Sequence, residues 1–452
     1  MTPARLPRII QRHEGSAIRA PGAQPLRRRN SFLIVTVALL SVAFVIGNVV
    51  FFNATPKPKR LHQPVQVDYG VSDPQFERTM SALMQNPVTS GNSIALLENG
   101  EAIYASMLAA IAEAEHSVTF ETYEFWGEEA AGAFATALSE AAERGVAVHA
   151  LLDYIGSTEA NPDTLERMED AGVEVIRWRE PSWYQLARFN HRTHRKLLIT
   201  DGETGFTGGA NVGDDWLPGR DGEAYRDNHF RLKGPVVANL QAAFMENWLD
   251  ASGALLLGEA YFPKLGDAGE VSLQVVNSAP REGYHRMRKM FLYAIAAAEE
   301  RITIGTAYFY PDPDFLDAVA DAADRGVKVR ILVPGDSIDK GFVRHASVNR
   351  WESMLQAGVQ LYEYQPSMYH SKLMSIDDQW VSIGSANLDN RSFRINDEAN
   401  VNIYDETFAR DIRHLVEEDL DDAERYDLER WRQRPWHKRL AGWLTMTVGG
   451  HL

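Results

Sequence analysis

The chain has 452 residues, no cysteine and a formal net charge of −16. This length allows two sizeable cores, and the lack of cysteine excludes disulfides and thiolate chemistry. The charge is uneven, because residues 1–60 carry a net +9 and the rest of the chain carries −25. A domain this acidic repels polyanions, which disfavours nucleic acid as a partner.

An uncharged apolar run at residues 32–52 follows a basic leader at residues 1–30. At about 1.5 Å per residue, such a helix spans the roughly 30 Å hydrocarbon core of a bilayer, so we predict a transmembrane helix at residues 31–52. A cleaved signal peptide is the alternative, but the run is too long and no A-x-A site follows it. Seven arginines precede the run and three basic residues follow it. The positive-inside rule therefore predicts a cytoplasmic leader and a catalytic domain on the outer side.

Residues 53–90, which we interpret as a linker, are punctuated by prolines at positions 56, 58, 64 and 74. Apolar spacing then predicts a helix over 104–114, a strand over 118–123, a helix over 130–144 and a strand over 146–152. This βαβ rhythm indicates an α/β fold with a mixed, mainly parallel sheet flanked by helices. The Ala-rich segment at residues 141–146 recurs at residues 322–327, which indicates an internal duplication. We predict one half at residues 91–265 and the other at residues 266–429.

Residues 430–452 form a last segment that is rich in arginine and lysine and contains Trp431, Trp436 and Trp443. Tryptophan at a boundary between basic and apolar residues is typical of a membrane interface. The alternative is a terminal helix that docks on the domain with its arginines in solvent.

Each half contains one copy of the pattern HxKxxxxDx6G[GS]xN, with 17 positions from the histidine to the asparagine in both copies. A single HxK would be weak evidence, but two copies with equal internal spacing are specific. The motif residues are His194, Lys196, Asp201, Gly209 and Asn211 in the first copy and His370, Lys372, Asp377, Ser385 and Asn387 in the second.

The motif predicts a β-hairpin that gathers an imidazole, an ammonium and an amide on one surface. His370 and Lys372 are two residues apart in a strand-like segment, so both side chains leave the same face. A turn centred on Asp378 and Gln379 would bring together residues whose numbers sum to 757, including His370 and Asn387. Such a surface suits a phosphate group, whose charge an ammonium offsets and whose oxygens accept hydrogen bonds.

The duplicated motif resembles the HKD signature of the phospholipase D superfamily, and the chain is most similar to the bacterial cardiolipin synthases over roughly residues 90–440. The resemblance implies two pseudo-twofold-related lobes and transfer of a phosphatidyl group without a metal or other cofactor. It also implies a phospholipid substrate, phosphatidylglycerol, in a single-pass enzyme of the bacterial inner membrane. By resemblance His194 is the nucleophile that forms a phosphohistidine and His370 is the acid and base, although the symmetry of the motifs leaves this order open.

The remaining motif positions have expected roles as well. Lys196 and Lys372 would offset the charge of the phosphate, whose oxygens Asn211, Asn387, Gly209 and Ser385 would bind. Acidic residues that follow each GxxN in the family correspond to Asp227 and Glu398, which we expect behind the imidazoles. The resemblance to the HKD signature implies that Asp201 and Asp377 are catalytic, but their position at the hairpin turns favours a role in shaping the turn. His191 lies outside the strand register, which favours a structural or rim role.

No HxH or HExxH pattern occurs, and the nearest acidic pair, Asp214 and Asp215, is more typical of a helix cap, which favours metal-free catalysis. The leading hypothesis is a membrane-anchored cardiolipin synthase. A hydrolytic phospholipase D or another phosphodiesterase on the same fold is the alternative, and a non-catalytic membrane-binding module is disfavoured because both copies keep every motif residue. The sequence leaves the phosphatidyl acceptor and the oligomeric state open.

Overall fold

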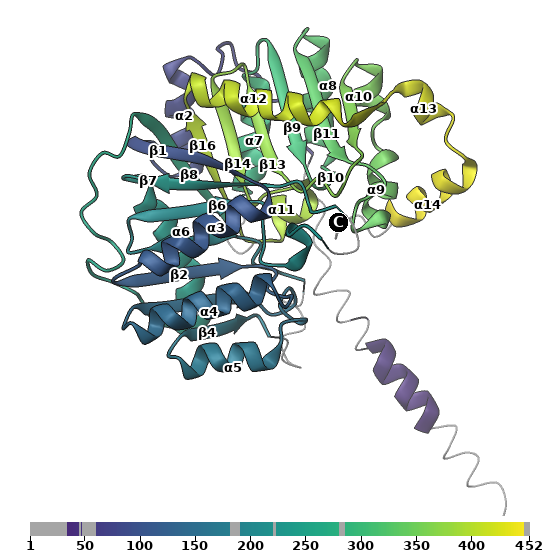
Figure 1. The fold of residues 1–452 in the computed structure, drawn as a ribbon. Coiled ribbons are helices and arrows are strands. Elements are labelled where there is room, and N and C mark those ends of the chain that lie inside the picture. Colours follow the sequence, from purple (N-terminus) through teal and green to yellow (C-terminus); the bar gives the residue numbers. More distant parts are fainter. Residues whose placement is uncertain are drawn as a thin grey trace, which may run out of the picture. The chain divides into compact units, whose positions relative to one another are not determined.

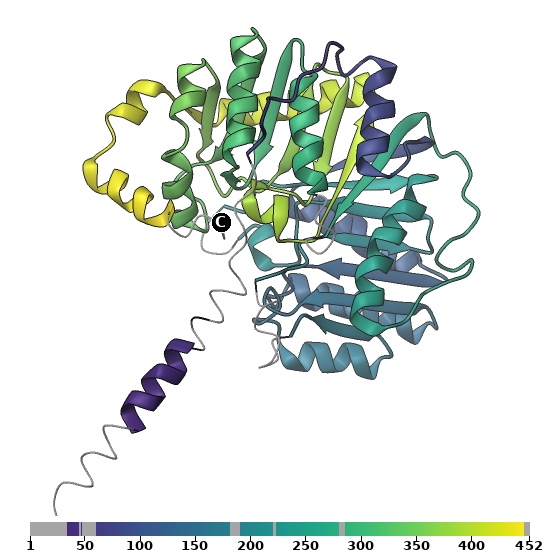
Figure 2. The same ribbon diagram turned by 180° about the vertical axis from the view of Figure 1, so that it is seen from behind.

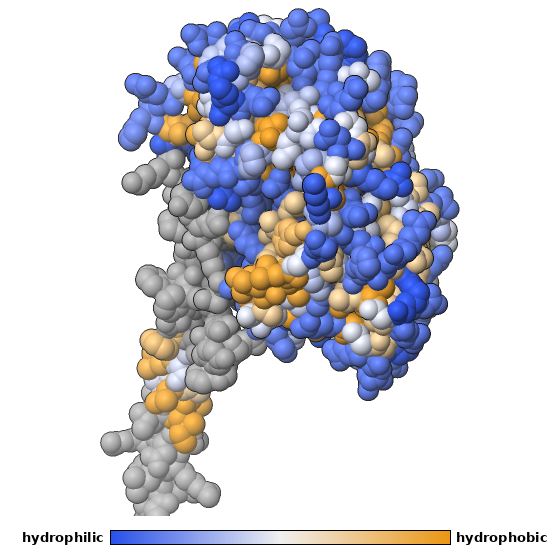
Figure 3. Space-filling view, turned by 90° about the vertical axis from the view of Figure 1, so that its left-hand side faces the viewer, coloured by the Kyte–Doolittle hydropathy of each residue, from blue (hydrophilic) through white to orange (hydrophobic). Residues whose placement is uncertain are grey.

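The computed structural model describes residues 34–44, 47, 60–180, 190–219, 223–279 and 285–446. The chain forms two compact units, Met1–Phe52 and Asn53–Leu452. In the first unit, residues 34–44 are helical and their apolar side chains are exposed, as the orange helix of Figure 3 shows. The predicted leader and part of the predicted transmembrane helix lie outside the described residues. No helix among the described residues is long and apolar enough to cross a membrane.

The second unit is a mixed α/β fold in which helices cover a large sheet (Figure 1). The elements of its first half are α2 (Pro74–Met84), β1 (Thr89–Glu98), α3 (Asn99–Glu113), β2 (Ser117–Thr122), α4 (Ala130–Glu143), β3 (Ala147–Asp153), α5 (Pro162–Asp170), β4 (Glu174–Trp178), β5 (Leu197–Thr200), β6 (Thr204–Gly208), the 3-10 helix η2 (Asp214–Trp216), β7 (Asn228–Lys233) and α6 (Val236–Ser252).

From its first strand on, the second half repeats the order that begins at β1, with three inserted elements and three further elements at its end. Its elements are β8 (Val271–Ser278), α7 (Arg286–Ala296), β9 (Arg301–Thr306), β10 (Phe309–Tyr310), α8 (Pro313–Asp324), β11 (Lys328–Pro334), α9 (Gly341–Val348), α10 (Glu352–Gln356), β12 (Gln360–Tyr364), β13 (Lys372–Ile376), β14 (Trp380–Gly384), β15 (Leu388–Asp389), α11 (Asn390–Arg394), β16 (Glu398–Tyr404), α12 (Glu406–Asp421), β17 (Ala423–Tyr426), α13 (Leu428–Arg432) and α14 (Trp436–Met446). The inserted elements are β10, α9 and β15.

The main sheet has 15 strands in the order β17-β12-β11-β9-β13-β14-β16-β8-β1-β7-β6-β5-β2-β3-β4. The order is the same in both halves when each is followed outward from the antiparallel pair β8 and β1. Strands β2, β3 and β4 are parallel, as are β9, β11 and β12, and the other neighbouring pairs described in this sheet are antiparallel. The prediction of a mainly parallel sheet is therefore wrong. The βαβ units supply only the outer strands of each half. The remaining neighbouring strands pair antiparallel, which requires no crossover helix.

The motif hairpins pair one residue away from the predicted register. In the second hairpin Ile376 pairs with Trp380 and Leu373 with Ile383, so that paired numbers sum to 756 instead of 757. The loop holds three residues, and two of them, Asp377 and Asp378, adopt left-handed φ angles of 53° and 52°. Aspartate tolerates this backbone region better than most residues, which makes the longer loop possible. The register therefore does not place His370 directly opposite Asn387.

Residues 74–84, which the sequence analysis placed in a linker, form the core helix α2. Asp73 caps the helix by accepting a hydrogen bond from the backbone N–H of Gln75, and a proline occupies its first turn. Phe76, Met80 and Met84 recur every four residues and are fully buried. The prolines of this stretch favour a linker, but a proline is also well suited to the first position of a helix.

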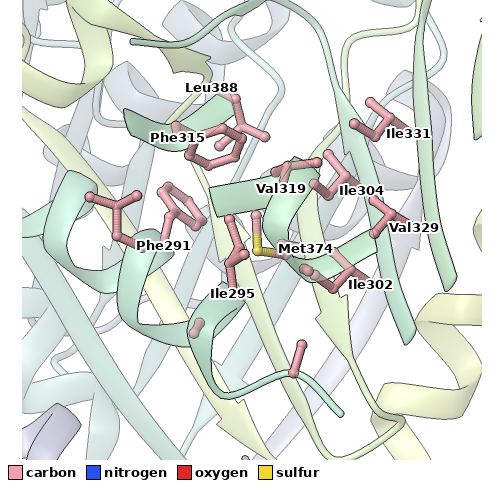
Figure 4. Packing of buried hydrophobic residues seen from close by; sticks show 14 of the residues in the cluster. Phe291, Ile295, Ile302, Ile304, Phe315, Val319, Val329, Ile331, Met374 and Leu388 are labelled. Carbon is pink, nitrogen blue, oxygen red and sulfur yellow. The ribbon is translucent and has the colours of Figure 1, made fainter. Parts of the chain in front are cut away.

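Three large hydrophobic clusters and one small one lie in the described part of the second unit. One joins α2, α7 and α8 to the sheet of the second half, where residues such as Phe291, Val319 and Ile331 interdigitate (Figure 4). Another combines residues of α3, α4 and α5 with strands of the first half. The third takes residues from α6 and α12 together with strands of both halves, so it joins the two halves in one core.

The C-terminal segment is docked on the domain. Helices α13 and α14, yellow in Figures 1 and 2, lie at one edge of the molecule beside α9. The indole of Trp431 donates a hydrogen bond to the carbonyl of Val348 at 2.7 Å. Trp436 and Leu440 instead stay 75% and 47% exposed. The docked arrangement that the sequence left as an alternative is therefore the observed one, and it leaves apolar side chains on the surface.

We predict that Phe76→Ala destabilises the catalytic domain, because the ring is fully buried and stacks on Tyr293 at 5.0 Å between ring centres. Loss of a buried aromatic ring costs about 3–5 kcal/mol, which lowers the unfolding temperature by several degrees. Thermal unfolding of the full chain measures the effect. Leu83→Ala on the same helix, where the side chain is 37% exposed, is the control, and equal unfolding temperatures for the two variants would contradict a core role for α2.

Candidate active site

The two motifs place their histidines and lysines at the starts of equivalent strands. Lys196 directly precedes β5, Lys372 is the first residue of β13, and each histidine lies two residues earlier. The four side chains are buried, with exposed fractions between 2% and 8%. Each lysine ammonium donates a hydrogen bond to the backbone carbonyl of the histidine in its own motif. The alternation expected of a strand thus keeps each imidazole and ammonium together.

Each imidazole contacts a carboxylate from the other half of the chain. Nδ1 of His370 lies 2.7 Å from Oδ2 of Asp227, and Nδ1 of His194 lies 3.0 Å from Oε2 of Glu398. Both carboxylates are fully buried. The structure therefore brings Asp227 and Glu398 to the imidazoles, with a crossing between the halves that the sequence did not reveal.

Backbone hydrogen bonds fix this crossing. The N–H of His370 donates to the carbonyl of Arg226 at 2.7 Å, next to Asp227 in the chain. The N–H of His194 donates to the carbonyl of Asp397 at 2.9 Å, next to Glu398. Each histidine segment is thus paired with the segment that carries its carboxylate, and the side-chain contact follows from backbone pairing.

The two carboxylates are held in different ways. Asp227 accepts a hydrogen bond from the indole of Trp216 at 2.9 Å, and a Cβ at Gly209 would overlap its carboxylate. Glu398 accepts hydrogen bonds from the hydroxyls of Ser385 at 2.5 Å and Ser392 at 2.6 Å. Gly209 and Ser385 thus support the carboxylates behind the imidazoles, which explains why the two copies differ at this position.

Burial and charge shift the protonation of the site. Burial lowers the pKa of His194 to about 4 and also lowers the pKa of His370, although the neighbouring carboxylates oppose this shift. Burial lowers the pKa of Lys196 to about 7 and that of Lys372 to about 8. Both imidazoles are therefore neutral at neutral pH, with Nδ1–H donating to a carboxylate and Nε2 available as a base or nucleophile.

The two asparagines of the motifs have different surroundings. Nδ2 of Asn211 donates to Oε2 of Glu124 at 2.8 Å, whereas the buried Oδ1 of Asn387 has no hydrogen-bond partner in the described part of the chain. Glu124 is a site residue that the motif does not include. Glu124 lies just after the buried strand β2, and Asp153 is the last residue of the neighbouring parallel strand β3. Acidic residues at the carboxyl ends of neighbouring parallel strands are a signal from which Glu124 could have been predicted.

Asp201 and Asp377 lie at the far ends of β5 and β13 from the imidazoles. Asp201 accepts hydrogen bonds from the backbone N–H groups of residues 115–117, and Asp377 from those of residues 299–301. The structure thus does not bring these aspartates to the histidines. Their carboxylates tie each hairpin turn to the start of the neighbouring strand.

The described residues contain no group of three or more histidine or acidic side chains arranged to hold a metal ion. Of the acidic pair noted in the sequence, Asp214 accepts hydrogen bonds from the backbone N–H groups of residues 128–130, where α4 begins. This is the geometry of a helix cap.

Comparison with known proteins identifies the relatives of this chain. A family model described as "Cardiolipin synthase, PLD-like domain" matches residues 107–248 and 291–420. The cardiolipin synthase of Geobacillus kaustophilus is 34% identical over 79% of this chain and 72% of its own length. Cardiolipin synthase A of Pseudomonas fluorescens is 37% identical over 76% of this chain and 71% of its own. The fold is similar to the solved structure of phosphatidylserine synthase from Haemophilus influenzae, with a TM-score of 0.64 at 14% identity over 83% of this chain and 99% of that one.

The crossed pairing predicts which imidazole each carboxylate controls. Asp227→Asn should lower the pKa of His370 by about 1–3, because the carboxylate favours the charged imidazole, and should disturb its Nδ1–H tautomer. Glu398→Gln should do the same to His194 and leave His370 unchanged. Nitrogen-15 NMR of labelled histidines reads both the tautomer and the titration. An effect of each variant on the histidine of its own half would contradict the crossing.

Proposed function

This chain belongs to the family of cardiolipin synthases with a phospholipase D-like domain and is a phosphatidyltransferase of that type, and we propose that it makes cardiolipin from two molecules of phosphatidylglycerol. One observation carries the proposal for the site. Two buried imidazoles each contact a carboxylate, and two buried lysine ammonium groups lie beside them. We also propose that the repeated halves of the sheet are two lobes related by a pseudo-twofold axis.

The reaction divides into two displacements at phosphorus. In the first, Nε2 of His194 bonds to phosphorus as the P–O bond to the headgroup glycerol breaks, and His370 gives its proton to the leaving oxygen. In the second, His370 takes the proton from a hydroxyl of the second phosphatidylglycerol. That oxygen then bonds to phosphorus as the P–N bond breaks. Cardiolipin and glycerol are the products, and both histidines return to their starting states.

The other motif residues stabilise charge during these steps. Lys196 and Lys372 offset the negative charge of the phosphoryl oxygens, and the amide of Asn387 contributes a further hydrogen bond. Asp227 stabilises the protonated form of His370, and Glu398 holds His194 in the tautomer whose Nε2 lone pair attacks. A bound phosphate anion raises the pKa of both lysines and of His370, so substrate binding itself prepares the acid. No metal enters these steps.

The proposed substrates are membrane lipids, and two parts of the chain suit contact with a bilayer. Residues 34–44 belong to the apolar run that we propose as a transmembrane anchor, and Ile34 and Phe44 are 68% and 72% exposed. On the catalytic domain, α9 and α14 expose Phe342, Trp436 and Leu440 beside the basic residues of the C-terminal segment. Exposed apolar side chains next to cations match the interface of an anionic bilayer.

The experiment that tests the function uses the full chain in phosphatidylglycerol vesicles. Wild type should release glycerol and form cardiolipin, whereas His194→Ala and His370→Ala should each lose a factor of about 10²–10⁴, because each removes an acid–base or nucleophilic role. His191→Ala serves as the control and should have a mild effect. Formation of phosphatidic acid without cardiolipin would contradict the proposed synthase activity and indicate a hydrolytic phospholipase D.

The pKa shifts predict a limited pH range for kcat/KM. Below about pH 4, His194 takes up a proton and loses its nucleophilic lone pair. Above about pH 7 to 8, Lys196 and Lys372 lose the protons that offset the phosphate charge. Since His370 must also carry a proton in the first step and burial lowers its pKa, the rate should be highest towards the acidic end of this range and should fall on the alkaline side. Initial rates from pH 4 to 9 measure the profile, and a rate that stays constant up to pH 9 would contradict the role of the lysines.

We propose that the enzyme lies in the bacterial inner membrane with its catalytic domain on the outer, periplasmic side, because more basic residues precede the apolar run than follow it. Protease added to intact spheroplasts should then digest the catalytic domain. A cytoplasmic marker protein should survive the same treatment. Full protection of the domain would place it on the cytoplasmic side instead.

A further inference from the structure

The two halves also differ just after the buried strands β2 and β9. Glu124 and Tyr308 occupy equivalent positions there, each two residues beyond its strand, and the carbonyl of each accepts a hydrogen bond from a strand-end threonine hydroxyl at 3.1 Å. Duplication thus placed a carboxylate on one side of the site and a phenol on the other. The reaction proposed above uses neither side chain.

These two residues belong to a patch that leads from the imidazole of His370 to the surface. The ring of Tyr225 lies 5.9 Å from that of His370 between ring centres, and the hydroxyl of Tyr308 donates to Oδ1 of Asp339 at 2.6 Å. Lys340 lies 3.4 Å from Oδ2 of Asp339. Burial decreases in the same direction, from the buried His370 through the half-buried tyrosines to the exposed Asp339 and Lys340. We call Glu124, Tyr225, Tyr308, Asp339 and Lys340 the polar patch.

The charges of the patch act on one another and on the motif. Burial raises the pKa of Tyr308, and the charges of Asp339 and Glu124 raise it further. Burial also raises the pKa of Glu124, which the ammonium of Lys196 opposes. Asp339 and Glu124 both act on Lys372 as well. The patch therefore adjoins the site where the phosphate would bind.

We propose that the polar patch is the alcohol subsite and that it binds the vicinal hydroxyls of a glycerol headgroup. The proposal rests on the function proposed above, in which both the leaving and the entering alcohol are glycerol groups. Since one histidine protonates the first alcohol and deprotonates the second, both must occupy the same place beside it. The patch lies beside His370, the residue to which the reaction assigns that role.

The chemistry of the patch fits hydroxyl groups better than an ammonium headgroup. A hydroxyl both donates and accepts, and the patch offers carboxylate acceptors in Glu124 and Asp339, acceptor lone pairs on its tyrosine hydroxyls and a donor in Lys340. An ammonium group needs an excess of negative charge. Here Lys196 and Lys340 oppose the charges of Glu124 and Asp339. The third carboxylate nearby, Asp215, already accepts a hydrogen bond from Tyr225, so little negative charge is left for an ammonium headgroup.

Occupation of this subsite also affects the choice between transfer and hydrolysis. Water at about 55 M competes with any alcohol for the phosphohistidine unless binding raises the alcohol's effective concentration at the histidine. A diol held by two hydroxyl contacts displaces water from the patch and gains that advantage. A simple alcohol with one hydroxyl cannot make the second contact.

The test measures how the phosphatidyl group partitions among added alcohols. The full chain in phosphatidylglycerol vesicles receives equal concentrations of deuterated glycerol, propan-1-ol and ethanolamine, and mass spectrometry counts each phosphatidyl product. Wild type should capture glycerol over propan-1-ol by about tenfold to a hundredfold, the range expected for a hydrogen bond to a charged group. Glu124→Gln and Tyr308→Phe should each reduce this ratio about tenfold.

The ratio separates binding from general damage, because misfolding lowers capture of both alcohols together. Glu129→Gln, which neutralises an exposed carboxylate near Glu124, is the control and should keep the wild-type ratio. Equal capture of glycerol and propan-1-ol, a preference for ethanolamine, capture of no alcohol, or an unchanged ratio in both variants would each overturn the proposal. If wild type makes no cardiolipin yet still prefers glycerol to propan-1-ol, the proposed synthase reaction is contradicted while the proposed diol subsite is supported.

Discussion

The active site depends on an exchange of carboxylates between the two halves of the chain. Asp227 of the first half supports His370 of the second, and Glu398 of the second half supports His194 of the first. Backbone hydrogen bonds beside each pair make the exchange part of the fold. Neither half alone holds an imidazole with its carboxylate, so the chemistry requires both. The shared core and the continuous sheet are what keep the two halves in register.

The same exchange accounts for the burial of so many charges. An isolated ammonium in a protein interior costs several kcal/mol, so Lys196 and Lys372 need compensation nearby. Asp227 and Glu398 provide it, and the set is neutral when both imidazoles are neutral. A bound phosphodiester adds one negative charge, which is best balanced by a proton on one imidazole. In the reaction that we propose, a neutral resting site therefore becomes one that holds a general acid only when the substrate is present.

Much of this arrangement was accessible from the sequence. The duplicated motif and the early βαβ elements follow from spacing, because strand periodicity and repeat spacing are local properties. Asp227 and Glu398 follow instead from the resemblance to the family. The missed features depend on context: Pro74 begins a core helix, and Asp377 and Asp378 adopt left-handed angles that lengthen a loop. The crossing of Asp227 to His370 depends on how the halves pair, which no local pattern encodes.

Duplication gave the halves one plan, and compensating changes then separated them in detail. The short carboxylate of Asp227 lies where a Cβ at Gly209 would be, and an indole completes its hydrogen bonds. The longer Glu398 instead takes a hydroxyl from Ser385. Either pair satisfies its buried carboxylate, whereas a side chain at position 209 would force Asp227 away from His370. Each carboxylate is thus matched to its own support, and each imidazole contacts a buried carboxylate in different surroundings. Such differences suit the different roles that we propose for the two nearly identical motifs.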